Sequence, residues 1–156
     1  SWEALAGAPG LAAPYAHLVA LDPPAEPAHE AALAAARGGR TAHLAWGEPE
    51  LAFSAHVHVR DLDLRAPLRD LYRALRDAGH GALADVLAQR PPRQSGRALR
   101  VLRELGLVVV DGGSFEVPEP PGRTELERSE SFRRCQARLE EGRSWLLSRA
   151  TAPLAA

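Results

Sequence analysis

The spacing of apolar residues before residue 60 is that of short strands around one helix. The runs His17–Leu21 and Thr41–Trp46 have the length of buried strands. Between them, Glu26–Arg37 is rich in alanine and has high helix propensity, and the glycines at 38 and 39 form a natural stop. A strand, a helix and a strand in this order predict a βαβ unit with two parallel strands.

Apolar residues also alternate over Leu51–Val59, which predicts a third strand. In such a strand His56 and His58 would share a face, a spacing that zinc can use. Cys135 is the one soft ligand in the chain, so we interpret the two imidazoles as part of a solvated strand face. The residues expected on the opposite, apolar face are Phe53, Ala55, Val57 and Val59.

After a polar connector at 60–66, the apolar spacing becomes helical. Pro67 suits the first turn of a helix. A second, short apolar stripe predicts another helix around residues 83–87. The apolar stripe of the first helix is Leu68, Leu71, Tyr72 and Leu75, its outer side carries Arg69, Arg73 and Arg76, and the stripe of the second is Leu83, Val86 and Leu87.

A third helix is predicted after Pro91 and Pro92, ending at Gly106. Its face opposite the apolar residues carries Arg97 and Arg100. The turn sequence at 111–113 then predicts a hairpin. Three helices followed by a hairpin are the order of a winged helix, a module that mostly binds nucleic acid or protein tails. The apolar face of the third helix is Ala98, Leu99, Leu102 and Leu105, and the hairpin strands are Leu107–Val110 and Ser114–Val117, flanking Asp111-Gly112-Gly113.

The last segment is predicted to be a linker, Pro118–Gly122, followed by a helix. Thr124 and Glu127 have the spacing of a capping box. We expect this helix to pack across both preceding parts or back onto the first. The predicted fold is therefore a small parallel α/β unit at 1–60, a winged-helix-like α+β unit at 61–120, and a linker with a helix at 121–156. The apolar positions of the final helix are Phe132, Cys135, Leu139, Gly142 and Leu146.

Charge is distributed unevenly along a chain whose net charge is −1. Residues 1–59 hold two Arg and six acids, a balance of −4, whereas residues 60–104 hold ten Arg and six acids, a balance of +4. All 19 basic residues are Arg. A GC-rich genome would explain this bias, and so would an anion-binding function. The guanidinium fork suits phosphates and carboxylates in either case, so the asymmetry favours an anionic partner for the middle of the chain.

Five Arg occur between residues 90 and 103, with no acid among them, and this cluster indicates a candidate binding surface. The alternative is a solvated helix face balanced by Asp85 and Glu104. Phosphates or the carboxylates of an acidic peptide would pair with such a surface. The candidate residues are Arg93, Arg97, Arg100 and Arg103, extended by Arg69, Arg73 and Arg76.

Composition and motifs give no indication of an enzyme. Ser95 and Ser114 lack a base partner in the sequence, and the lone Cys135 excludes an internal disulfide and fits a reducing compartment. Neither a membrane span nor a signal peptide is present, which predicts a cytoplasmic location. The chain begins at Ser1 and contains no methionine, so we expect it to be a piece of a longer protein.

Five segments follow one another along nearly the whole chain, and their motifs consist mostly of hydrophobic and turn residues. They are His17–Asp22 with Pro24, His43–Gly47, Pro67–Leu75, Leu102–Val108, and the pattern Arg123-x-Glu125-Leu126-x-x-Ser129-x-Ser131-Phe132-x-x-x-Gln136. In this order they resemble the C-terminal region of the RecJ single-stranded-DNA-specific exonucleases.

The resemblance implies an accessory module of a 5′–3′ exonuclease of DNA repair and recombination. The family hydrolyses DNA with Mn or Mg held by a core containing Asp-His-His, and no such triplet occurs here. Neither catalysis nor a cofactor is therefore expected of this chain. The implied partner is the acidic C-terminal tail of single-stranded DNA-binding protein, with single-stranded DNA and other repair proteins as further partners. We expect a monomer. The alternative is a free-standing winged-helix DNA-binding regulator, with Arg97 and Arg100 in the major groove.

Overall fold

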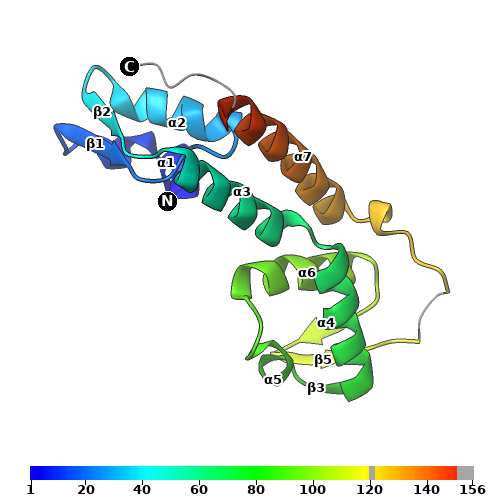
Figure 1. Ribbon diagram of the computed structural model, residues 1–156. Coiled ribbons are helices and arrows are strands. Elements are labelled where there is room, and N and C mark those ends of the chain that lie inside the picture. Colours follow the sequence, from blue (N-terminus) through cyan, green and yellow to red (C-terminus); the bar gives the residue numbers. More distant parts are fainter. Residues whose placement is uncertain (120–121, 151–156) are drawn as a thin grey trace. The chain divides into compact units, whose positions relative to one another are not determined.

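The computed structural model describes residues 1–119 and 122–150, which form a mixed α+β protein of two compact units. The first unit contains Ser1–Val59 and the described residues from Arg138 onward. The second contains Arg60–Ala137. Two helices, α3 (Glu48–Leu62) and α7 (Glu130–Ala150), each contribute residues to both units. Figure 1 shows the order of the elements.

The parallel βαβ arrangement predicted at the start of the chain is confirmed. Strand β1 (His17–Ala20) pairs in parallel with β2 (Thr41–Leu44), and α2 (Pro27–Arg37) connects them. Gly38 ends α2 at φ 45°, a left-handed conformation that favours glycine. Ahead of β1, the short helix α1 (Trp2–Gly7) packs against α2.

The third strand predicted over Leu51–Val59 is wrong, because these residues belong to helix α3. The buried positions are Leu51, His58 and Leu62, a helical spacing, whereas Phe53 is 62% exposed. The start signal lies just upstream, where the Glu50 side chain accepts a hydrogen bond from the Gly47 amide at 2.7 Å. A bond from the side chain of the third helical residue back to the preceding amide is one half of a capping box.

Because the segment is helical, the two histidines do not share a face. His58 is buried and its Nε2 donates to the carbonyl oxygen of Arg138 at 2.9 Å, whereas His56 is exposed. Within residues 1–119 and 122–150, no group of three or more His, Cys, Asp or Glu residues is placed to hold a metal. The proposed polar connector at 60–66 is also incorrect, since Leu62 and Leu64 are among the most buried residues.

The helices of the second unit are α4 (Arg65–Ala78), the short α5 (Leu83–Leu87) and α6 (Pro92–Glu104). Helices α4 and α6 pack together, each through one apolar stripe. The buried residues are Leu68, Leu71 and Leu75 on α4, and Ser95, Ala98, Val101 and Leu102 on α6.

The sheet of the second unit has three antiparallel strands in the order β3-β5-β4. The predicted hairpin forms between β4 (Val109–Asp111) and β5 (Ser114–Glu116), with a two-residue turn at Gly112 and Gly113. Their φ angles of 52° and 88° fit the turn that matches the twist of hairpin strands. Strand β3 (His80–Ala82) pairs with β5, at a position where the sequence predicted no strand.

The buried face of α7 is the one predicted from its sequence: Phe132, Cys135, Leu139, Gly142 and Leu146. Its start differs from the prediction, because α7 begins at Glu130 and the hydroxyl of Ser129 accepts the Phe132 amide hydrogen at 3.1 Å. The segment Leu126–Arg128 is instead a 3₁₀ turn. The predicted linker includes residues 120 and 121, which lie outside the described residues. None of the described helices combines the length and apolar character needed to span a membrane.

Candidate anion-binding surface

The exposed side of α6 carries the candidate surface predicted from the sequence. Pro92 lies in the first turn of the helix, where a missing amide hydrogen costs nothing. Burial of the apolar stripe turns the opposite side of the helix outward. At 100° per residue, Arg93 and Arg100 project in nearly the same direction, about 20° apart. Both are exposed, as is Arg103, and none of the three makes an ion pair with a described residue.

Arg97 differs from its neighbours because it is partly buried and already bonded. Its NH1 donates to the carbonyl oxygen of Asp61 at 2.7 Å, and the Gln94 amide donates to the carbonyl oxygen of Arg60. These carbonyls belong to the last turn of α3, where no helical amide is available to them. Arg97 therefore holds α6 against the end of α3, and only its remaining donors could meet a ligand.

The arginines of α4 lie on the outer face of that helix, away from its packed stripe. Arg69 pairs with the neighbouring Asp70 at 3.2 Å, while Arg73 and Arg76 are exposed. Since α4 and α6 pack through their apolar stripes, each set of arginines occupies the outer face of its own helix. We therefore take the surface of α6, defined as Arg93, Arg100 and Arg103, as the candidate anion-binding surface.

Glu104, the acid at the end of α6, is held by the start of α7. Its carboxylate accepts hydrogen bonds from the hydroxyl of Ser129 at 2.6 Å, the amide of Ser131 at 3.0 Å and the hydroxyl of Ser131. The hydroxyl bonds, aided by the nearby charge of Arg100, hold the pKa of Glu104 below its usual value. No sequence motif indicated this contact, because the partners are 25 and 27 residues apart.

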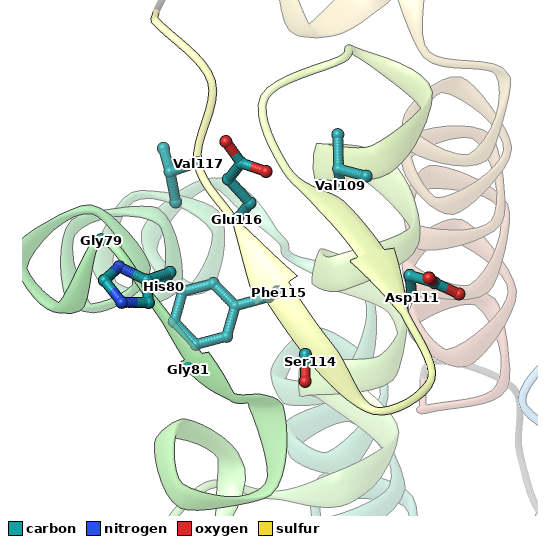
Figure 2. Close-up of a pocket in the computed structure, with 9 residues that line it drawn as sticks. All are labelled: Gly79, His80, Gly81, Val109, Asp111, Ser114, Phe115, Glu116 and Val117. Carbon is teal, nitrogen blue, oxygen red and sulfur yellow. The ribbon is translucent and has the colours of Figure 1, made fainter.

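A pocket lies on the sheet of the same unit, and its charge is opposite to that of the α6 surface. It is open, with a volume of about 740 Å³, and Figure 2 shows the residues that line it. In the register of the sheet, Glu116 of β5 lies opposite both His80 of β3 and Val109 of β4. Asp111 lies two residues further along β4. Two carboxylates make this pocket unsuitable for an anion. Sequence reasoning missed it because β3, which completes the sheet, was not predicted. Its lining residues are Gly79, His80, Gly81, Val109, Asp111, Ser114, Phe115, Glu116 and Val117.

A buried ion pair and a buried histidine lie together in the first unit. The carboxylate of Glu26, which is 7% exposed, accepts hydrogen bonds from two guanidinium nitrogens of Arg138, the shorter at 2.6 Å. His29 is stacked on Trp2 with ring centroids 5.6 Å apart, and burial lowers its pKa despite the opposing charge of Glu26. A buried ion pair next to a desolvated imidazole needs close mutual placement to be stable. This cluster ties α2 to α7 through Glu26 and Arg138.

Comparison of the chain with models of known protein families, with curated proteins and with solved structures gave no match.

Proposed function

We propose that the chain is a non-catalytic accessory module of a RecJ-like 5′–3′ single-stranded-DNA exonuclease. In this proposal, its second unit is a winged helix whose α6 binds the acidic C-terminal tail of single-stranded DNA-binding protein. Mn or Mg would be held by the catalytic core of the longer protein and not by this chain.

The order of elements in the second unit supports the winged-helix assignment. A helix, a strand, two helices and a hairpin occur in sequence, and the strand between the first two helices joins the hairpin as β3-β5-β4. In the proposed winged helix, α6 is the recognition helix and β4–β5 is the wing. A recognition helix presents one face to its ligand, and in α6 that face carries exposed arginines.

The observation that carries the proposal is that Arg93, Arg100 and Arg103 are exposed and make no ion pair with a described residue. Guanidinium groups pair with carboxylates through parallel hydrogen bonds, so a short acidic peptide could bind along the helix. The acid at the end of the helix, Glu104, accepts bonds from Ser129 and Ser131 and makes no ion pair with any of the three arginines, although the charge of Arg100 is near it.

The charge of the wing favours a peptide over a DNA duplex. Asp111 and Glu116 are exposed on β4 and β5, where a DNA-binding wing would meet phosphates. Repulsion by these carboxylates would oppose a long polyanion, whereas a short tail could bind α6 without reaching them. A free-standing winged-helix regulator that binds DNA is the second candidate. The arginines of α6 support it, and the carboxylates of Asp111 and Glu116 oppose it.

The test is titration of a labelled acidic tail peptide of single-stranded DNA-binding protein onto the chain and onto Arg93→Glu and Arg100→Glu. Since the surface is exposed, each reversal should weaken binding about three- to tenfold, as expected for pairs worth on the order of 0.2–1 kcal/mol, with the reversal adding repulsion. Arg143→Glu, an exposed position of the first unit with the same charge change, is the matched control and should bind like the parent chain.

Two further measurements separate the two candidates. Deleting the last residue of the peptide should weaken binding sharply if the tail is anchored at its end. A DNA duplex should bind weakly, with affinity falling steeply in salt only if many phosphates are contacted. Equal affinity of the parent chain, Arg93→Glu and Arg100→Glu for the peptide would mean that the α6 surface is a solvated helix face.

A further inference from the structure

The parallel sheet of the first unit has an uncovered face and an open edge. Parallel strands are usually buried on both faces. Here β1 alternates between exposed and half-buried residues, and Val19 on its exposed face is 59% accessible. Leu21, directly after β1, is 67% accessible. Among the described residues, β1 has only β2 as a neighbour, so its other edge pairs with no strand.

The register shows which backbone groups of β1 face this open edge. The carbonyl oxygen of Ala20 accepts the Ala45 amide hydrogen at 2.9 Å, so Ala20 directs its groups toward β2. In a parallel ladder, alternate residues direct both their amide and carbonyl to the same side. Leu18 therefore also faces β2, whereas His17 and Val19 direct theirs outward, and Leu21 continues this alternation.

A groove of about 280 Å³ runs beside the same edge. Trp2 and Leu5 of α1 and Leu33 of α2 line it together with the residues of β1 from Leu18 to Asp22. Its walls are mostly apolar side chains, and water in it would meet few polar partners. The edge thus offers unpaired backbone groups next to an apolar hollow, which are the two features that β-strand addition uses.

We propose that this edge pairs with the same edge of a second copy of the chain, in an antiparallel arrangement centred on Val19. In that register Val19 faces Val19 of the second copy, and His17 faces Leu21. These are the residues whose backbone groups point outward, and in an antiparallel ladder each such facing pair exchanges two hydrogen bonds. The outward groups of β1 are thus complementary to those of a second copy about a two-fold axis.

Side-chain chemistry agrees with this register. Residues that face each other across antiparallel strands have side chains on the same face, so the exposed Val19 would contact its own equivalent. Leu18 and Ala20 lie on the half-buried face of β1. Leu18 of the second copy would therefore project on the groove side of the sheet. The proposal departs from the monomer expected from sequence and is independent of the anion-binding surface on the other unit.

Hydrogen exchange combined with sedimentation provides the test. An interface this short should be weak, so the chain is examined from about 5 µM to about 1 mM. A dimer should appear with concentration, and the amides of Val19 and Leu21 should gain protection with it. The amides of Leu18 and Ala20, which face β2, should show protection that does not change with concentration.

Val19→Pro removes the outward amide and leaves the ladder with β2 intact, and edge positions tolerate proline. It should weaken dimerisation at least tenfold, while the matched control Val19→Thr, which keeps the amide and a β-branched side chain, should stay within about threefold of the parent. If Val19→Pro fails to fold, the sedimentation and hydrogen exchange of the parent chain as a function of concentration are the test. A monomer at every concentration, or a dimer without added protection at Val19, would overturn the proposal.

Discussion

The carboxylate of Glu104 lies 2.6 Å from the hydroxyl oxygen of Ser129, and this contact joins the end of α6 to the start of α7. The Ser129 hydroxyl donates to Glu104 and accepts the amide hydrogen of Phe132 at 3.1 Å. One serine thus caps α7 and holds the last residue of the candidate binding helix. Ser129 is 1% exposed, so water cannot replace either partner.

Replacing Ser129 by alanine should destabilise the second unit. The change removes the helix cap and one bond to Glu104, and lost caps cost about 0.5–2 kcal/mol in free energy of unfolding. Urea unfolding followed by circular dichroism measures the effect. Ser144→Ala, an exposed position in the same helix, is the control and should change stability by less than about 0.5 kcal/mol. Equal stability of the two variants would contradict the assigned cap.

The same contact predicts a dependence of stability on pH. The pKa of Glu104 is lower in the folded chain than the usual value, so the folded state favours the ionised carboxylate. Its contribution is present above the usual glutamate pKa, near 4.5, and is lost as pH falls through the lower, folded value. Unfolding measured from about pH 6 to about pH 3 should therefore show a smaller acid-induced loss for Glu104→Gln than for the parent chain.

Gly142 provides a sharp test of packing in the first unit. A Cβ atom at this position would overlap the imidazole ring of His58. Gly142→Ala should therefore displace His58 from the Arg138 carbonyl and cost about 1–3 kcal/mol, the usual range for overpacking.

Gly96 is the matched control for this substitution, because a Cβ atom there has nothing within 4 Å. In an exposed helix, Gly96→Ala should instead stabilise by about 0.5–1 kcal/mol. In a chain that already carries His58→Ala, adding Gly142→Ala should cost less free energy of unfolding than it costs in the parent chain, because the imidazole ring that it would overlap is absent. Strict additivity of the two changes would show that the residues do not meet.

Arg97 and Arg100 should differ in stability although both were predicted as ligand contacts. Arg97→Ala removes a bond to the Asp61 carbonyl and should cost on the order of 1–2 kcal/mol. Arg100→Ala removes an exposed side chain without an ion pair among the described residues and should stay within about 0.5 kcal/mol of the parent. Thermal unfolding of the two variants in parallel measures the difference. A larger loss of stability for Arg100→Ala than for Arg97→Ala would contradict the structural role given to Arg97.

Purified chain should not degrade single-stranded DNA, even with Mn or Mg supplied. Metal-dependent hydrolysis needs clustered carboxylate and imidazole ligands, and the part of the chain that the structure describes contains no such group of three. Release of labelled nucleotides is the measurement, with a DNA-degrading nuclease as positive control. Metal-dependent release that a single substitution in the chain abolishes would contradict the proposed non-catalytic role.

Two segments show why local patterns misled the prediction of the fold. Over residues 51–59, β-branched and apolar residues alternate by chance, and tertiary burial of Leu51, His58 and Leu62 selects the helix. Strand β3 was missed because Gly79, His80 and Gly81 favour a turn. Gly81 lies opposite Phe115 with φ 149°, a conformation that residues with a side chain rarely adopt, so glycine allows this backbone to pair with β5.

The sequence by itself determined the features that depend on residues close in the chain. These are the parallel βαβ start, the basic helix after Pro91, the glycine turn of the hairpin and the buried stripe of α7, because periodicity and turn chemistry act over a few residues. Long-range packing determines which arginines are bonded to other described residues, since the bond of Arg97 to Asp61 spans 36 residues. It likewise decided that Glu104 caps a distant helix and that the edge of β1 is open, because long-range packing has no local pattern that records it.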